Sequence, residues 1–221
     1  MILAIDTATR WAGLALHDGT AVIAEYGWRC LNNHTIEISP AIQDMLRRVD
    51  LTTNDLDGIS VAIGPGSYTG LRVGLALAKG MALASQIPLI GVPTLDIVAF
   101  SIEQMPVQLL VAAEAGRTRV CVAVYQWQDQ KGWQARRPPM IDTWENVVAS
   151  VENPTLFAGE ITPGATKLIR SSNRHFSVAH PAISTRRAGF LAEIGWQRFR
   201  AGQLDDAASL APIYLRDPAG K

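Results

Sequence analysis

The 221-residue sequence has only two cysteines and four histidines, and its 20 basic side chains balance its 20 acidic ones. Cys30 and Cys121 are isolated and form no Cys-x-x-Cys pair, which argues against a disulfide framework or a thiolate metal site. We expect two reduced thiols that behave as small buried apolar groups. The zero net charge lacks the basic field typical of a protein that binds nucleic acid on its own.

Long apolar runs are also missing. The longest uncharged stretch, residues 80–95, is interrupted by Gln86 and Pro88 and is shorter than the roughly 18 apolar residues that a membrane helix needs. No basic segment precedes the apolar residues that lead to Asp6, so no signal peptide is recognisable. The sequence therefore predicts a cytoplasmic protein without a membrane span.

The histidines predict no metal site. His17, His34, His175 and His180 form no pair at the spacing of helical metal ligands. No spacing of Ser, His and Asp selects a catalytic triad either. We therefore expect no metal ligands and no catalytic residues of these types.

What is present is an alternation of apolar runs and turns that predicts an α/β fold. In the first half we expect strands at residues 2–5, 11–16, 21–26, 59–63 and 89–92, and helices at residues 38–49 and 71–85. Pro40 lies inside the first helical pattern, where it either occupies the first turn or bends the helix. Gly74 and Gly80 lie inside the second, where each costs up to about 1 kcal/mol relative to Ala. We expect another element to approach closely at both glycines.

The second half begins with a pattern similar to the first. We expect strands at residues 107–113, 120–125 and 155–158, and helices at residues 162–170 and 184–200. Apolar strand, acidic turn and apolar strand occur twice, with Asp6 and Glu114 in equivalent places; the pattern alone leaves duplication and chance similarity open. We expect two domains, residues 1–105 and 106–221, with the apolar residues 210–216 docking back.

A glycine-rich turn at residues 64–70 separates a strand from a helix. Such a turn leaves helix amides free for an anion. No Gly-Lys-Ser/Thr follows it, and Pro65 and Thr69 stand where a nucleophile elbow requires glycine. Spacing alone favours a structural turn over a ligand loop.

Asp6, Thr7 and Thr9 follow the first strand. At this place a carboxylate can hold magnesium through water, and hydroxyls can meet phosphate oxygens, as in actin-like phosphotransferases. Alternatively, Asp6 closes an Asx turn on its own backbone. Both interpretations stay open, and these three residues are the candidate cofactor-binding set.

One cluster combines aromatic and basic residues, namely Trp127, Trp133, Arg136 and Arg137, in a hairpin expected to turn at Lys131-Gly132. Such a hairpin can stack on RNA, so a tRNA contact at residues 127–137 is an open question. A solvated amphipathic hairpin is the favoured interpretation.

Four segments together resemble the bacterial TsaB (YeaZ) family of the tRNA threonylcarbamoyladenosine machinery. They are residues 2–9 (ILAIDTAT), His34-Thr35, residues 64–74 (GPGSYTGLRVG) and residues 212–216 (PIYLR). The resemblance covers nearly the whole chain. It implies an actin-like, sugar-kinase and Hsp70-type (ASKHA) fold of two related lobes, with mixed sheets flanked by helices. On this basis the internal repeat is a duplication.

The resemblance also implies a non-catalytic subunit without a cofactor of its own. In the catalytic relative TsaD, the corresponding strand leads into a histidine pair that binds the catalytic metal, whereas residues 90–97 here contain no histidine. Glu114 and Gly116 replace an aspartate and an arginine usual in the TsaB family, which weighs against a nucleotide role of this lobe.

The partners implied are TsaD in a heterodimer and TsaE in a ternary complex, with a homodimer when the protein is alone. The complex forms N6-threonylcarbamoyladenosine at position 37 of tRNAs that read ANN codons, and tRNA is met only through the complex. Expected interface residues on the two N-lobe helices are His34, Ile38, Ile42, Leu46, Tyr68, Leu71, Leu75 and Ala78. Leu75→Glu is expected to abolish both dimerisation and TsaD binding and to leave a folded monomer.

Two alternatives stay open. One is a small ATP-binding or ATP-hydrolysing protein that uses Asp6, Thr7 and Thr9. The other is a peptidase that acts on TsaD, which is the weaker alternative because the histidine pair and a triad are missing.

Overall fold

The computed structural model describes residues 1–30, 33–116 and 118–215, which form two compact lobes. The first lobe comprises Met1–Ile97 and Arg187–Ile213, and the second comprises Val98–Arg186 with the described residues from Tyr214 onward. This division differs from the expected one, residues 1–105 and 106–221. The physical reason is that the chain from Arg187 returns to pack on the first sheet.

The first lobe is built on a five-stranded mixed sheet in the order β3-β2-β1-β4-β5. Its hairpin strands pair antiparallel, whereas β1, β4 and β5 are parallel. The elements are β1 (Ile2–Asp6), β2 (Trp11–His17), β3 (Val22–Arg29), α1 (His34–Arg48), the 3₁₀ turn η1 (Thr53–Asp55), β4 (Gly58–Gly64), α2 (Tyr68–Ser85), β5 (Leu89–Pro93) and α7 (Ala188–Arg200). Helix α3 (Thr94–Phe100) leads into the second lobe.

The second lobe has its own mixed sheet, in the order β11-β10-β6-β7-β8, with β9 also paired to β7. The elements are β6 (Gln108–Glu114), β7 (Val120–Gln128), β8 (Gly132–Ala135), β9 (Met140–Asp142), α4 (Trp144–Ala149), β10 (Thr155–Gly159), α5 (Pro163–Ser172), β11 (Phe176–Val178) and α6 (Pro181–Ser184). Its core includes Phe157 and Phe176, whose rings pack edge to face with 5.4 Å between their centroids.

The two sheets have the same topology. The order β3-β2-β1-β4-β5 of the first lobe corresponds strand by strand to β8-β7-β6-β10-β11 of the second. Each matched pair of neighbours also has the same sense, antiparallel or parallel. Asp6 ends β1 and Glu114 ends β6, so the two acidic turns occupy equivalent places. The repeat seen in the sequence is therefore a duplicated unit.

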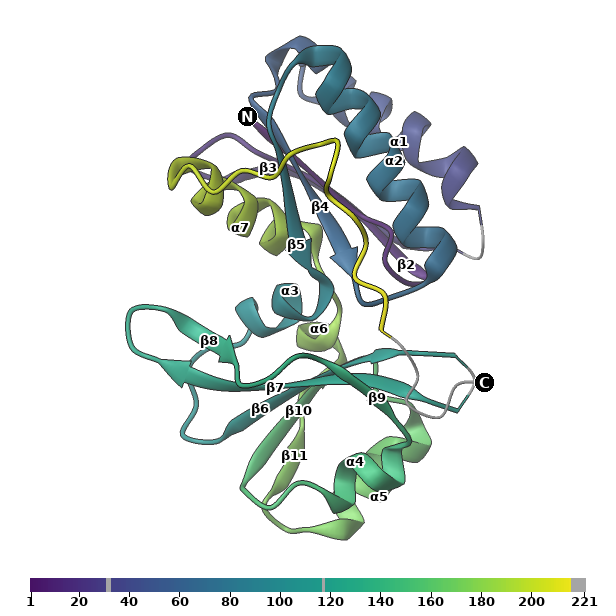
Figure 1. Cartoon of the computed structure of the whole chain (residues 1–221), viewed down its shortest axis with the longest axis vertical. Coiled ribbons are helices and arrows are strands. Elements are labelled where there is room, and N and C mark those ends of the chain that lie inside the picture. The colour runs from purple at the N-terminus through teal and green to yellow at the C-terminus, as the bar shows by residue number, and fades with distance from the viewer. Residues whose placement is uncertain (31–32, 117, 216–221) are drawn as a thin grey trace. The chain divides into compact units, whose positions relative to one another are not determined.

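Helices cover both faces of the first sheet, with α1 and α2 on one face and α7 on the other (Figure 1). Successive residues of a strand point to opposite faces, so Leu3 and Ile5 join the core under α1 and α2 while Ala4 joins the core under α7. Small residues let α7 come close: a Cβ added at Gly195 would lie 2.5 Å from the Cβ of Ser60.

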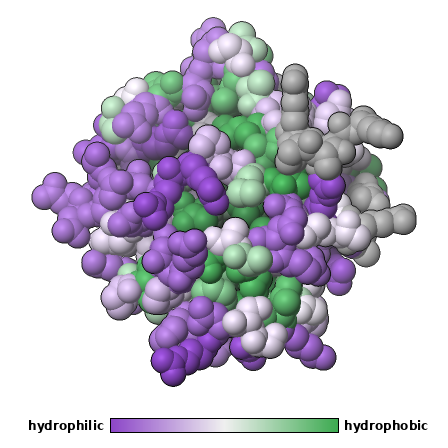
Figure 2. Space-filling model, turned by 60° about the horizontal axis from the view of Figure 1, so that its bottom comes forward, coloured by the Kyte–Doolittle hydropathy of each residue, from purple (hydrophilic) through white to green (hydrophobic). Residues whose placement is uncertain are grey.

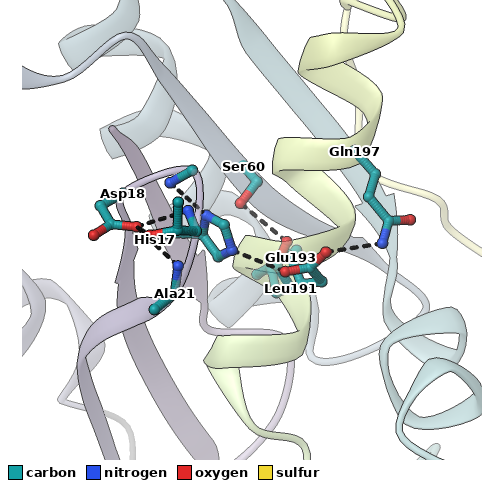
Figure 3. Close-up of polar contacts among 9 residues, drawn as sticks. His17, Asp18, Ala21, Ser60, Leu191, Glu193 and Gln197 are labelled. Carbon is teal, nitrogen blue, oxygen red and sulfur yellow. Dashed lines mark hydrogen bonds and ion pairs between the residues drawn. The ribbon is translucent and has the colours of Figure 1, made fainter.

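Polar contacts fix α7 on this face (Figure 3). The buried ring of His17 meets Glu193 at 2.8 Å between Nε2 and Oε2, and its Nδ1 accepts a hydrogen bond of 2.9 Å from the Gly19 amide. The Ser60 hydroxyl donates to the Leu191 carbonyl at 3.3 Å. A helix from the far end of the sequence thus completes the first lobe.

The expected helix at residues 184–200 is interrupted. Helix α6 ends at Ser184 and α7 begins at Ala188, because Arg187 is extended, with φ −100° and ψ 130°. The break lies where the chain passes from the second lobe to the first. The other expected strands and helices are confirmed, and Pro40 lies within α1. The elements η1, α3, α4, β9 and β11 and most of α6 were not expected, because they are too short for a clear periodicity.

The two cysteines are buried, as expected. Cys30 and Cys121 are free and buried, and burial raises the pKa of the Cys121 thiol to about 12. Among the described residues, no helix combines the length and apolar character that crossing a membrane requires. On the face seen in Figure 2, hydrophilic side chains surround smaller hydrophobic areas.

Candidate partner-docking groove

The glycine-rich turn is built around the chain's own first turn. The Ser67 amide donates to the Ala8 carbonyl at 2.6 Å. A Cβ at Gly66 would lie 2.2 Å from the Ala8 oxygen, and one at Gly70 would lie 2.2 Å from the Thr7 oxygen. Any side chain at these two positions would collide with backbone. The two glycines therefore allow the β1–β2 turn to pack closely against the start of α2.

The three candidate cofactor-binding residues lie together in that turn and are buried. The Ala8 amide donates to Oδ1 of Asp6 at 2.9 Å, which is the geometry of an Asx turn. The Thr7 hydroxyl donates to the Gly70 carbonyl at 2.7 Å, and Thr9 Oγ1 accepts from the Trp11 amide at 3.3 Å. These polar groups hold the turn against α2 and against their own backbone.

The first residue of helix α1, His34, contacts the same turn. Nε2 of His34 lies 3.1 Å from the Thr9 carbonyl oxygen, and the His34 ring is buried. Three separate segments of the sequence, residues 2–9, 34–35 and 64–74, thus meet around one turn. Their contacts place the starts of α1 and α2 side by side.

An open groove runs between these two helices, with a volume of about 500 Å³. Its walls come from one turn and a half of α1 and from the first half of α2, and most of the lining is apolar. The lining residues are His34, Thr35, Ile38, Ser39, Tyr68, Thr69, Arg72, Val73, Ala76 and Leu77.

The α2 side of the groove carries a cation stacked on an aromatic ring and, farther along, small exposed residues. The Arg72 guanidinium carbon lies 3.9 Å from the centroid of the Tyr68 ring, within the range of a cation–π contact. Farther along the same helix, Ala76 and Gly80 are exposed, and Leu83 is 65% exposed. Among the described residues, no heavy atom lies within 4 Å of a Cβ added at Gly80, so the close approach expected there is not made by that part of the chain.

Ionic and polar contacts anchor α1 to β3. Trp28 Nε1 donates to Glu37 at 2.7 Å, and this bond is the largest cause that lowers the pKa of Glu37. Asp44 accepts from Arg48 at 2.7 Å and from the Tyr26 hydroxyl at 2.9 Å. Arg48 and then Arg47 lower the pKa of Asp44 well below its usual range. The α1 wall is thereby held on the lobe.

The structure corrects most of the expected interface residues. Six of them are at most 4% exposed: Ile38, Ile42, Leu46, Leu71, Leu75 and Ala78. His34 is buried against Thr9, and Tyr68 is the one expected residue that is exposed, at 56%. The apolar faces of α1 and α2 turn into the lobe. The outer surface of each helix is therefore formed by the residues on its other faces.

The hairpin that was a candidate for RNA stacking uses its aromatic rings internally. Trp133 is buried and its Nε1 donates to the Ile102 carbonyl at 2.9 Å. Trp127 packs edge to face on Trp133, with 5.5 Å between ring centroids. Arg136 and Arg137 remain exposed.

The end of the chain docks on the first lobe, as expected. The Ile213 amide donates to the Ile63 carbonyl at 2.7 Å, and a Cβ at Gly64 would lie 2.7 Å from the Ile213 oxygen. Leu210 lies against Gly91. Arg216, which belongs to the same motif, and Arg117 of the Glu114 turn lie outside the described residues.

Residues 90–97 fall in β5 and α3, and Ile90, Val92 and Ile97 are part of the core. Among the described residues, no three His, Cys, Asp or Glu side chains are grouped so that they could hold a metal ion.

Comparison with known proteins finds a matching family model and similar relatives. The family model of TsaD, tRNA N6-adenosine threonylcarbamoyltransferase, matches residues 29–219. The tRNA threonylcarbamoyladenosine biosynthesis protein TsaB of Bacillus subtilis is 32% identical, over 97% of this chain and 93% of the relative.

Solved structures show the fold. YeaZ from Pseudomonas aeruginosa has a TM-score of 0.77 at 22% identity, over 96% of this chain and 99% of that one. The ethanolamine utilization protein EutJ of Carboxydothermus hydrogenoformans has a TM-score of 0.50 at 14% identity, over 86% and 89% of the two chains. With the duplicated mixed sheets, these likenesses confirm the expected ASKHA fold. The identity to the B. subtilis protein along nearly its whole length shows that the chain belongs to the TsaB (YeaZ) family.

Proposed function

We propose that this protein is a non-catalytic subunit of the machinery that forms N6-threonylcarbamoyladenosine at position 37 of tRNAs reading ANN codons. Its task is to bind a TsaD-type catalytic subunit and hold it in a competent state. The names of its relatives support the pathway, since TsaB of B. subtilis is a tRNA threonylcarbamoyladenosine biosynthesis protein and the matching family model is that of the transferase itself.

The observation that carries the proposal is that two of the four family-like segments, residues 34–35 and 64–74, line one open groove. His34 and Thr35 form one wall, and Tyr68, Thr69 and Arg72 form the other. These two segments therefore contribute side chains to a surface groove, which supports a docking role. An apolar groove that remains open on a folded lobe suits a partner protein.

The docking surface follows from the exposed side of α2. Ala76 and Gly80 allow a partner backbone to come close, while Leu83 and Tyr68 supply apolar area at the two ends of the helix. The same surface is proposed to mediate the homodimer, which TsaD displaces before TsaE joins. Since TsaD and a second copy use one surface, a single substitution should weaken both contacts.

A nucleotide role for the first turn is the weaker candidate. The carboxylate of Asp6 and the hydroxyls of Thr7 and Thr9 are engaged in hydrogen bonds within the lobe. Binding of phosphate or magnesium at this place would require these bonds to be exchanged. The chemistry of transfer is accordingly assigned to TsaD.

The test is reconstitution of the modification with TsaC, TsaD, TsaE, ATP, threonine, bicarbonate and tRNA. Ala76→Arg puts a long charged side chain on the groove wall and is expected to abolish co-elution with TsaD and modification together. Ala149→Arg, at an exposed alanine of α4 in the second lobe, is the matched control and should leave both unchanged. Full modification with Ala76→Arg would contradict the proposed docking surface.

Asp6→Asn separates the two candidate functions, because the amide oxygen can still accept the Ala8 hydrogen bond. The scaffold role predicts normal TsaD binding and normal modification. Loss of modification with TsaD binding intact would instead assign a nucleotide or metal role to the first turn.

A further inference from the structure

A second concave site lies wholly within the second lobe and plays no part in the proposed docking. It has a volume of about 340 Å³, near the lower end of the range of small-molecule pockets. One wall is the connection from β8 to β9, and the other is the connection from α4 to β10. The floor lies on β6 and β7, on the face of the sheet that carries α4.

The floor of this pocket is apolar. Leu110 of β6, Val122 of β7 and Val147 of α4 are buried in the lobe core, and each lines the pocket. Val124 and Met140 line it as well and are half-buried. A surface of aliphatic side chains on a sheet can accept a flat ring by burying one of its faces.

Two adjacent guanidinium groups stand on the first wall. Arg136 and Arg137 are exposed, and within the described residues neither forms an ion pair. The wall is held on β7 at both ends, because the Arg136 amide donates to the Val124 carbonyl at 2.9 Å and Met140 pairs with Val122. Pro138 and Pro139 lie between these anchors and restrict the backbone. Guanidinium groups on a restrained segment favour phosphate or carboxylate binding.

The opposite wall offers a carboxylate and amides. Ser150, Glu152 and Asn153 line it, and Gln108 of β6 adds a second amide. This wall is also held: the Ser150 hydroxyl donates to the Val147 carbonyl at 2.8 Å, and the Gln108 amide donates to the Pro154 carbonyl at 3.0 Å. An aliphatic carboxylate has no group to donate to Glu152, whereas a nucleotide has ribose hydroxyls and base amino groups.

We propose that this pocket binds one nucleotide, either free or as part of an RNA single strand. The base lies against Val124 and Met140, the half-buried aliphatic side chains of the floor, the phosphate meets Arg136 and Arg137, and the sugar or base edge donates to Glu152. The three kinds of lining match the three parts of a nucleotide: ring, anion and hydroxyl donors. The inference does not depend on the docking groove, which lies in the other lobe.

The experiment is calorimetric titration of the full chain with AMP, with a short single-stranded oligoribonucleotide, with inorganic phosphate and with decanoate. AMP or the oligonucleotide should bind more tightly than phosphate and decanoate. Binding of AMP assigns a free nucleotide, and binding of the oligonucleotide alone assigns RNA. Absence of binding by both, or binding of decanoate as tight as that of AMP, would overturn the proposal.

Three variants locate the site. Arg136→Ala with Arg137→Ala is expected to weaken nucleotide binding about tenfold or more, since two charge-assisted contacts are lost. Glu152→Ala should weaken binding of the nucleotide but not of inorganic phosphate. Lys131→Ala, an exposed cation in the turn of the same hairpin, is the matched control and should change nothing. Binding that survives the double arginine variant would show that the nucleotide lies elsewhere.

Discussion

The side chain of Thr7 occupies the space that a Cβ at Gly74 would need: such an atom would lie 2.2 Å from Thr7 Oγ1. The same hydroxyl donates to the Gly70 carbonyl one turn earlier on α2. A glycine inside the helix, which costs helical stability, is therefore required by the first turn of the chain.

Gly74→Ala should destabilise the protein by about 1–3 kcal/mol, because the added methyl overpacks the contact with Thr7. Gly80→Ala is the matched control on the same helix, where no heavy atom of the described residues lies within 4 Å of the added Cβ, and it should stabilise by up to about 1 kcal/mol. Urea unfolding of both variants measures the difference. Equal effects of the two substitutions would refute the assigned role of Thr7.

Leu75→Glu should unfold the first lobe or weaken it by about 3 kcal/mol or more, because it places a charge in the core. This replaces the expectation of a folded monomer. Ala76→Arg, one residue along, should change the free energy of unfolding by about 0.5 kcal/mol or less. Circular dichroism during thermal unfolding separates them; a cooperative wild-type transition for Leu75→Glu would show that Leu75 is not in the core.

Glu193→Ala should lower the free energy of unfolding by about 1–3 kcal/mol, because the buried Nε2–H of His17 loses its acceptor. Glu193→Gln keeps an acceptor oxygen and should lose less. Gln197→Ala removes only the 2.9 Å contact that Gln197 makes with Glu193 on the exposed side of α7 and serves as the control. If the control is as destabilised as Glu193→Ala, the effect arises from the helix rather than from His17.

Asp18 predicts a dependence of stability on pH. The Thr20 amide, then the Thr20 hydroxyl and the Ala21 amide, lower the pKa of the Asp18 carboxyl to about 2. A pKa depressed in the folded state contributes stability that is present above the unfolded value of about 3.9 and is lost as the pH falls toward about 2. The stability deficit of Asp18→Ala relative to wild type should therefore shrink across that interval.

Titration of the Asp18 carboxyl carbon by NMR checks this directly. A midpoint near 2 supports the turn seen in the structure. A midpoint at the unfolded value of about 4 would show that the amide bonds are not maintained in solution.

The sequence by itself determined the longer elements and the family. Apolar runs bounded by turns locate the longer strands, and Gly64, Gly66 and Gly70 are specific because backbone atoms leave no room for a side chain there. The repeat of strand and acidic turn at Asp6 and Glu114 indicated a duplication but left chance similarity open, and the matching strand orders of the two sheets decided it.

Only the tertiary structure decided which face of each helix is free. Leu75 and Ala76 are neighbours in sequence, and periodicity shows that Leu75 belongs to an apolar face, but whether that face meets the chain's own sheet or a partner depends on where the sheet lies. The return of α7 to the first lobe and the presence of Arg136 and Glu152 in one pocket are likewise set by long-range packing. Local patterns carry no information on such contacts, because they arise from packing between segments that are distant in the chain.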